Sequence, residues 1–268
     1  MAGQDSRHET YDDLHKGQLS QQEERNADSA RKILTHLFEM ARAESVIDVG
    51  SGLGTWLKTA QEMGVETVQG VEGEWIKTAD LKVDLGLIHV CDLEQGFDLK
   101  TRFDLVITLE VGEHLAPEAA EVFVESLCRH GDVVLFSAAI PFQGGHHHVN
   151  EQFLSYWMEL FAKHGYRPLD VIRPLIWDDE AMLWWLRQNI VVFANGEGLA
   201  KYPKLAEEGA KHLGPISVVH PKIYMDRLAP LYKQFNELVG LQNHLAQGGT
   251  FKAGFKPSGE FTVVRIGD

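Results

Sequence analysis

VIDVGSGLGTWL, residues 46–57, is the stretch that decides the fold of this chain. Three apolar β-forming residues around Asp48 predict a short buried strand. A helix is expected to begin near Thr55, after a turn made of three glycines, Gly50, Gly52 and Gly54. Because glycine has no Cβ, such a turn lets the backbone approach a bound ligand closely. The stretch therefore predicts a strand, turn and helix that bind a nucleotide-like cofactor.

Two acidic residues favour one kind of cofactor. Asp48 lies inside the predicted strand, two residues before the first glycine, where a carboxylate repels pyrophosphate and attracts a cationic amino acid group. Glu72 ends the next strand-like run, VQGVE, about twenty residues beyond the glycines, the distance at which an acid reaches ribose hydroxyls in doubly wound folds. Together the two acids indicate S-adenosylmethionine and argue against NAD.

The chain resembles the class I S-adenosylmethionine-dependent methyltransferases over roughly residues 29–194. The pieces that match, in the family's order and spacing, are VIDVGSGLG, VEGEW, CDLEQGF, FDLVITLEVGEHL and VVLFSAAIP. The resemblance implies a doubly wound α/β fold, with a mostly parallel seven-stranded Rossmann-like sheet and S-adenosylmethionine as the cofactor.

The resemblance also implies roles for single residues. Asp48, Gly50 and Gly52 are expected to line the methionine and ribose end of the cofactor. Glu72 is expected to bind the ribose hydroxyls and Asp92 to approach the adenine amine. Glu72 stands where the family more often has Asp, which changes the reach of its carboxylate. Further cofactor contacts are expected from Ser51, Leu93 and Glu110.

Apolar runs predict an alternation of strands and helices, which implies a mostly parallel sheet with right-handed crossovers. After the strand at Val46 and the strand that ends near Glu72, further strands are expected at 87–90, 103–109, 133–137, 166–172 and 188–194. Helices are expected from Asp28 or Ser29, over 55–63 and 117–128, and after Asn150. The segment WDDEAMLWWLR is too short for an easy parallel crossover, so the final strand is expected to be antiparallel. Its three tryptophans are expected in the core rather than on a substrate platform.

Composition and charge argue against several classes of protein. The chain has 268 residues, enough for one α/β core and an appendage, and its 44% hydrophobic and 24% charged content are ordinary for a soluble globular protein. Its net charge of -14 disfavours broad binding of nucleic acid, because that affinity rests on Lys and Arg. Two cysteines, Cys91 and Cys128, supply neither a disulfide framework nor a zinc pattern. With no apolar run suited to a membrane and no signal peptide, the expected location is cytoplasmic.

Three regions are expected along the chain. Residues 1–28 are polar and acid-rich, which predicts a mobile segment. Residues 29–194 form the expected cofactor-binding domain, and residues 195–268 a helical appendage that selects the substrate or contacts a second copy. In similar methyltransferases the N-terminal segment can close over the cofactor, and here a lid would use Tyr11, Leu14 and Leu19.

The appendage carries one apolar seam at roughly heptad spacing, made of Leu228, Leu231, Phe235, Leu238 and Leu245. This pattern is compatible with two arrangements: the helix packs against its own domain, or it pairs with a second copy in a homodimer. The final stretch, FKAGFKPSGEFTVVRI, predicts a hairpin that turns at Pro257 to Gly259.

Two loops that follow neighbouring strands carry the residues suited to chemistry. LEVGEHL follows the fourth predicted strand and brings Glu110, Glu113 and His114 to the edge where ligands gather in open α/β sheets. GGHHHVNEQ follows the fifth strand and brings three histidines, His146, His147 and His148. Two carboxylates and two imidazoles at one place suit a divalent metal, with Mn²⁺, Fe²⁺, Co²⁺, Ni²⁺ or Zn²⁺ favoured over Mg²⁺ by ligand softness.

The Glu-x-x-Glu-His run is similar to that of the small-RNA 2'-O-methyltransferases and the ubiquinone-pathway O-methyltransferases. This resemblance implies the metal ligands Glu110, Glu113, His114 and His148, because His148 precedes VNEQF. His146 or His147 is then expected to accept the proton, and Glu113 is expected to be needed for turnover. The alternative is that Glu113 and His114 cap a helix while the histidines occupy a polar loop.

These residues predict an O-methyltransferase acting on a hydroxyl of a small molecule, such as a sugar or secondary metabolite. A metal-independent O- or N-methyltransferase with a histidine base is the second hypothesis, and a non-catalytic module that holds S-adenosylmethionine is the third. A dehydrogenase is the alternative at the level of the fold, and methylation of RNA is disfavoured by the acidic balance.

Overall fold

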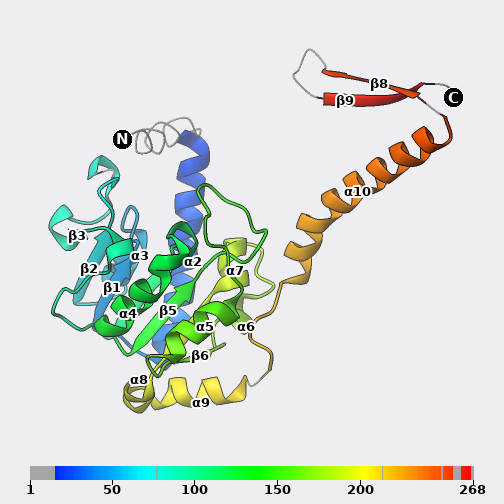
Figure 1. Cartoon of the computed structure of the whole chain (residues 1–268). Coiled ribbons are helices and arrows are strands. Elements are labelled where there is room, and N and C mark those ends of the chain that lie inside the picture. Colours follow the sequence, from blue (N-terminus) through cyan, green and yellow to red (C-terminus); the bar gives the residue numbers. More distant parts are fainter. Residues whose placement is uncertain (1–15, 77, 213, 249, 256–260, 267–268) are drawn as a thin grey trace. The chain divides into compact units, whose positions relative to one another are not determined.

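The structure is a computed structural model that describes residues 16–76, 78–212, 214–248, 250–255 and 261–266. It divides into two units, Met1–His220 and Pro221–Asp268. The first is an α/β domain and the second consists of a long helix and a two-stranded hairpin (Figure 1).

The α/β domain is built on one seven-stranded sheet of order β3-β2-β1-β4-β5-β7-β6. Strand β7 runs antiparallel to both β5 and β6, and the pairs among β1 to β5 are parallel. The predicted doubly wound sheet and its antiparallel final strand are thereby confirmed. The strands are β1 (Ser45–Val49), β2 (Thr67–Glu72), β3 (Ile88–Val90), β4 (Leu105–Leu109), β5 (Val133–Ser137), β6 (Arg167–Leu169) and β7 (Val191–Ala194).

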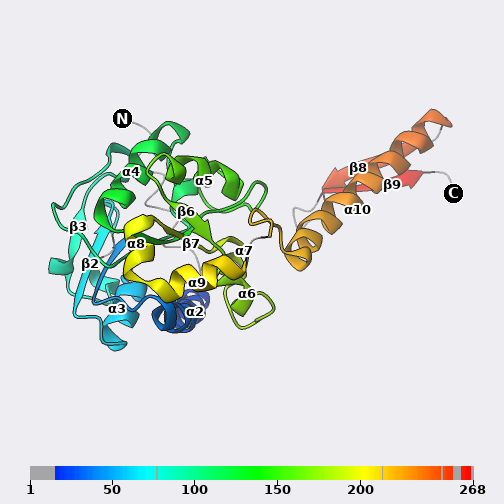
Figure 2. The same cartoon turned by 90° about the horizontal axis from the view of Figure 1, so that it is seen from below.

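Helices cover both faces of this sheet (Figure 2). Along β1 the side chains alternate, so that Val46 packs with α2 and α3 while Ile47 packs with α4 and α5. The sheet is therefore buried on both faces, and the carboxyl ends of its strands, where the cofactor is expected, are held by this core. The helices are α2 (Lys16–Met40), α3 (Thr55–Glu62), α4 (Ala120–His130), α5 (Leu154–Ala162), α6 (Arg173–Ile176), α7 (Trp184–Asn189), α8 (Gly196–Lys201) and α9 (Pro203–Lys211).

Helix α2 extends well beyond the predicted start at Asp28 or Ser29. Its N-terminal half is attached to α3 by polar contacts: Thr55 Oγ1 donates to Glu23 Oε2 at 2.8 Å and Trp56 Nε1 donates to Asn26 Oδ1 at 3.2 Å. Polar contacts leave no apolar periodicity in the sequence, which explains the missed start. Of the predicted lid, Tyr11, Leu14 and the side chain of Leu19 lie outside the described residues.

The last two strands are shorter than predicted. Strand β6 stops before Asp170, whose carboxylate accepts two hydrogen bonds from the Arg173 guanidinium at 2.8 and 2.7 Å and turns the chain into α6. Gln188 and Asn189 belong to α7 rather than to β7, and their side-chain amides donate hydrogen bonds to Val218 O and to the Glu110 carboxylate. The three tryptophans of this segment are only partly buried: Trp177, Trp184 and Trp185.

The second unit contains α10 (Pro221–Ala246) and the antiparallel pair β8 (Thr250–Phe255) and β9 (Phe261–Ile266). Both strands of the predicted hairpin are thus present, and its turn lies outside the described residues. The five side chains of the α10 seam are between 38% and 60% exposed: Leu228, Leu231, Phe235, Leu238 and Leu245. Within the described part of the chain, no helix combines the length and hydrophobicity that crossing a bilayer requires.

Candidate active site

The turn between β1 and α3 holds three glycines for different reasons. All three have positive φ, at 77°, 52° and 78° for Gly50, Gly52 and Gly54. A Cβ on Gly50 would lie 2.3 Å from Val111 Cγ2, and one on Gly54 would lie 2.7 Å from Val83 Cγ2. No heavy atom of the described residues would lie within 4 Å of a Cβ on Gly52. Gly50 and Gly54 therefore make room for protein side chains, and Gly52 faces the open side where a ligand can approach.

Asp48 and Glu72 lie buried at the ends of the two neighbouring strands β1 and β2. Glu72 accepts hydrogen bonds from the main-chain N–H groups of Gly52 at 2.6 Å and Gly73 at 2.8 Å, which ties the glycine turn to β2. Burial raises the pKa of Glu72. Burial, with a smaller contribution from the charge of Glu72, raises the pKa of Asp48 to about 8. A cation bound here would offset both effects, so the pair suits a positively charged ligand.

The remaining predicted cofactor residues lie along the same edge. Asp92 is exposed and its Oδ1 accepts a hydrogen bond from Glu94 N at 3.0 Å, while Leu93 is 2% exposed within the core. Burial, followed by the charges of Asp92 and Glu72, raises the pKa of the Cys91 thiol. Ser51 Oγ is buried and has no hydrogen-bond partner among the described residues.

Trp75 also belongs to this edge and was missed from the sequence. Its indole donates a hydrogen bond to Glu72, and its ring lies against Gly73, where a Cβ would come within 2.2 Å of it. The side chain is 53% exposed, so one face of the ring is open to a ligand. The signal was present, because an aromatic residue stands three positions after Glu72 in VEGEW.

At the end of β4, Glu110 is held by two amides. Gln143 Nε2 donates to its carboxylate at 2.8 Å and Asn189 Nδ2 at 3.0 Å, and Asn189 Nδ2 also donates to Gln143 Oε1 at 2.9 Å. Gln143 and Asn189 were not predicted as site residues. They come from the β5–α5 loop and from α7, so no local pattern connects them to Glu110.

Glu113 is fully buried, yet among the described residues neither carboxylate oxygen accepts a hydrogen bond of normal geometry. Burial and the neighbouring charge of Glu110 raise the pKa of Glu113 to about 9, although nearby main-chain N–H groups act in the opposite direction. Its own main-chain carbonyl accepts hydrogen bonds from Val149 N at 2.8 Å and Asn150 N at 3.0 Å. These two bonds join the loop after β5 to the loop after β4.

Glu113, His114 and His148 form a cluster whose ligand atoms all lie within 4.8 Å of one another. The rings of His114 and His148 meet edge to face, with centroids 4.9 Å apart. Burial, followed by the proximity of His148, lowers the pKa of His114 to about 4, which keeps the imidazole neutral and able to bind a metal. One carboxylate and two imidazoles, with unpartnered buried oxygens, fit a divalent cation.

The fourth predicted ligand, Glu110, is not among the three residues that meet this mutual distance, and its carboxylate accepts hydrogen bonds from the amides of Gln143 and Asn189. His146 and His147 are exposed and contact each other with ring centroids 3.9 Å apart. They also lie outside the cluster and face solvent, which suits transfer of a proton to water.

Backbone strain gathers at this site. Three residues other than glycine adopt positive φ along the two loops: Glu110 at 56°, Phe142 at 68° and His147 at 56°. Such conformations cost of order 1–3 kcal/mol each and persist where the surrounding structure imposes them. In the described chain the fourth residue of this kind, Lys100, lies in a separate turn. The concentration of strain points to the two loops as a functional site.

Methyltransferases are among the solved structures to which this chain is similar. No family model matches the chain, and no curated protein matches it. Among solved structures, the methyltransferase domain of bacterial CtHen1-C is 18% identical, with 64% of this chain and 99% of that chain covered and a TM-score of 0.46. DesVI of Streptomyces venezuelae is 16% identical (63% and 92% covered, TM-score 0.48), and the sugar N-methyltransferase KedS8 of a Streptoalloteichus species is 17% identical (63% and 86%, TM-score 0.48).

The sheet order 3-2-1-4-5-7-6 with an antiparallel β7 is that of the S-adenosylmethionine-dependent methyltransferase fold. At the identities found, the similarity concerns the fold, and the site must be argued from its own residues.

Proposed function

We propose that this protein is an S-adenosylmethionine-dependent O-methyltransferase that acts on a hydroxyl of a small molecule and uses a divalent metal. The observation that carries the proposal is Glu113, a buried carboxyl group beside two imidazoles whose side-chain oxygens, among the described residues, accept no hydrogen bond of normal geometry. Such a group is strongly destabilised unless a cation binds it. The acidic chain favours a small acceptor over a nucleic acid.

Each residue of the site has a role in this proposal. Asp48 and Glu72 bind and orient the donor, with Asp48 beside its positive charge and Glu72 at the ribose hydroxyls. Glu113, His114 and His148 hold the metal, which when bound polarises the acceptor hydroxyl and lowers its pKa. Because the sulfonium already activates the methyl group, alignment of acceptor and donor supplies most of the acceleration.

The exposed pair His146 and His147 accepts the hydroxyl proton and releases it to solvent in this proposal. Removal of that proton by a general base contributes about 10² to 10⁴ in rate. Asp92 at the adenine, Ser51, Leu93 and the glycines complete the proposed cofactor contacts, and Glu110 contacts the cofactor or joins the metal as a fourth ligand.

The variant Glu113→Gln tests the proposal, because it keeps the shape of the side chain and removes the charge. We expect unchanged binding of S-adenosylhomocysteine by calorimetry, loss of bound Mn²⁺ or Co²⁺ by elemental analysis, and loss of methyl transfer across a panel of sugars and phenols. Full wild-type activity after exhaustive chelation would contradict the role of the metal.

A metal-independent methyltransferase, acting on oxygen or nitrogen, is the second candidate. The specific observation in its favour is that Glu110, the expected fourth ligand, is bonded to two amides, while two histidines stand free of the metal cluster at the same loop. Under this alternative, turnover survives chelation and Glu113→Gln but not removal of both His146 and His147. Tight cofactor binding without any turnover would instead identify a binding module.

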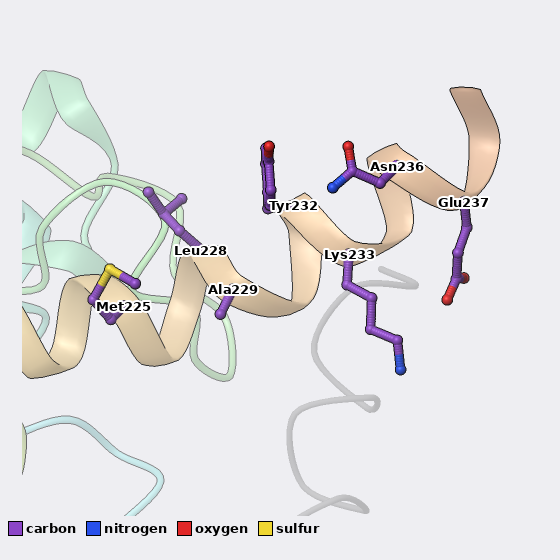
Figure 3. Close-up of a pocket in the computed structure, with 7 residues that line it drawn as sticks. All are labelled: Met225, Leu228, Ala229, Tyr232, Lys233, Asn236 and Glu237. Carbon is purple, nitrogen blue, oxygen red and sulfur yellow. The ribbon is translucent and has the colours of Figure 1, made fainter. Parts of the chain in front are cut away.

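Helix α10 is proposed as the contact between two copies in a homodimer. Its seam is exposed, and residues from successive turns of the same helix, which Figure 3 labels, line a groove. The groove is lined by Met225, Leu228, Ala229, Tyr232, Lys233, Asn236 and Glu237. An exposed seam at heptad spacing matches a second helix of its own kind.

Light scattering tests this contact. The double variant Leu231→Glu and Leu238→Glu is expected to convert dimer to monomer, whereas Asn243→Glu, outside the seam, is expected to leave the dimer intact. A monomeric wild-type protein would contradict the proposed homodimer.

A further inference from the structure

Glu151 lies behind the metal cluster and has no role in the function proposed above. Its side chain is 19% exposed and receives three hydrogen bonds. Oε2 accepts from Phe142 N at 2.8 Å, while Oε1 accepts from Gly144 N at 2.7 Å and contacts His148 Nδ1 at 2.9 Å. One carboxylate thus joins both ends of the histidine loop and the ring of a proposed metal ligand.

The contact with Glu151 decides the tautomer of His148. Because a carboxylate offers only acceptors, the 2.9 Å contact pairs it with the tautomer of His148 that has its hydrogen on Nδ1. The Nε2 atom then carries the lone pair and is the nitrogen available to a metal. His114 has the corresponding support, because its ring donates a hydrogen bond to the main-chain carbonyl of His147. Each imidazole of the cluster is therefore oriented by an acceptor behind it.

The same carboxylate holds the loop in its strained shape. Phe142 and Gly144 both have φ of 68°, and both direct their N–H groups to Glu151. Gly145 follows, and a Cβ there would lie 2.1 Å from His148 Nε2, so the ring packs directly on the glycine backbone. The loop conformation and the ring position are thus set together.

We propose that Glu151 is a positioning residue of the metal site: it fixes His148 with Nδ1–H directed to its carboxylate and Nε2 available beside Glu113 and His114. This inference rests on the proposed metal-assisted function. Glu151 touches neither the donor nor the acceptor in the proposal, and it acts through His148 and the loop.

The experiment compares Glu151→Ala and Glu151→Gln with the wild type. Gln keeps one acceptor oxygen, but its NH₂ group would face at least one N–H donor. Glu151→Gln should therefore weaken Mn²⁺ binding less than Glu151→Ala does. Asp98→Ala is the matched control, because Asp98 Oδ1 accepts the N–H of Lys100, another residue with positive φ, away from the site. Mn²⁺ affinity is measured by electron paramagnetic resonance, and the His148 tautomer is measured by ¹⁵N NMR of the metal-free protein.

We expect Glu151→Ala to weaken Mn²⁺ binding by about 10- to 100-fold, the range found when such outer partners are removed. In metal-free wild type the His148 proton should be on Nδ1, and in Glu151→Ala it should move to Nε2. Asp98→Ala should change neither, and binding of S-adenosylhomocysteine should be unchanged in all variants, which shows that they fold.

Unchanged Mn²⁺ affinity and an unchanged His148 tautomer in Glu151→Ala would overturn the inference. If wild type binds S-adenosylhomocysteine but no Mn²⁺, Co²⁺ or Zn²⁺, the metal in the proposed function fails. In that case the tautomer alone decides whether Glu151 positions His148.

Discussion

The loops after β1 and after β5, both at the carboxyl edge of the sheet, reach positive φ by opposite means. The turn after β1 uses glycine at every position of positive φ, so its shape follows from the residues within it. The loop after β5 places Phe142 and His147 in the same region of φ. Hydrogen bonds that main-chain N–H groups of the loop donate to the Glu151 carboxylate and to the main-chain carbonyl of Glu113 hold it there. A cofactor turn can be locally encoded, whereas this histidine loop depends on partners elsewhere in the chain.

The largest expected effect is on stability, and it differs between two glycine variants of the loop after β1. Gly50→Ala should destabilise the protein by about 3 kcal/mol, because its Cβ overlaps the buried Val111 in addition to the backbone strain. Gly52→Ala should cost about 1 kcal/mol, since only the left-handed backbone opposes it. Chemical denaturation measures both, and calorimetry should show weaker S-adenosylmethionine binding in Gly52→Ala. Equal losses of stability would mean that Val111 moves freely and the distinction between the glycines is wrong.

The next effect concerns the charge beneath that turn. The pKa of Asp48 is about 8 in the folded protein against a model-compound value of 3.8. Between these values the folded state binds more protons than the unfolded state, so the free energy of unfolding falls as pH rises from about 4 to about 8. Asp48→Asn should remove this slope and stabilise the cofactor-free protein by about 2 kcal/mol at pH 8, while weakening donor binding.

Thermal unfolding of both proteins between pH 5 and pH 8, with and without S-adenosylmethionine, checks this expectation. At about 2–4 °C per kcal/mol, the difference in melting temperature is measurable. A slope with pH that is identical in wild type and Asp48→Asn would contradict it.

The smallest effect is expected from single substitutions in the second loop. His146→Ala and His147→Ala should each lower turnover by less than about tenfold, because the two exposed rings lie together and either one can pass a proton to water. The double variant should lose about 10² in turnover and keep full Mn²⁺ affinity. Loss of the metal in the double variant would show that these histidines are ligands rather than proton acceptors.

The sheet was predictable because its strands are apolar runs bounded by polar turns. The bounds of β5, Val133–Ser137, agree with the prediction, and the short connection before the last strand indicated its antiparallel direction. The prediction failed where polar side chains decide the local structure. Asp170 ends β6 by bonding Arg173, and Glu23 attaches the early turns of α2 to Thr55.

In the candidate site, too, some residues have a local signal in the sequence and others have none. The acids and glycines of the cofactor edge follow from one motif, and the Glu-His run and the histidine loop could be placed at one edge by strand order alone. The bonds of Gln143 and Asn189 to Glu110 join segments distant in the sequence and leave no local signal. Glu151 had a signal in the spacing of HVNE, which puts a carboxylate three residues after His148.

The acidic edge formed by β1 and β2 is proposed to bind a cationic sulfonium nucleoside. Isothermal titration of the wild-type protein and of Glu72→Ala with S-adenosylmethionine and with NAD⁺ tests it most directly. We expect micromolar binding of S-adenosylmethionine by the wild type, at least about tenfold weaker binding by Glu72→Ala, and no heat from NAD⁺. Binding of NAD⁺ without binding of S-adenosylmethionine would contradict it.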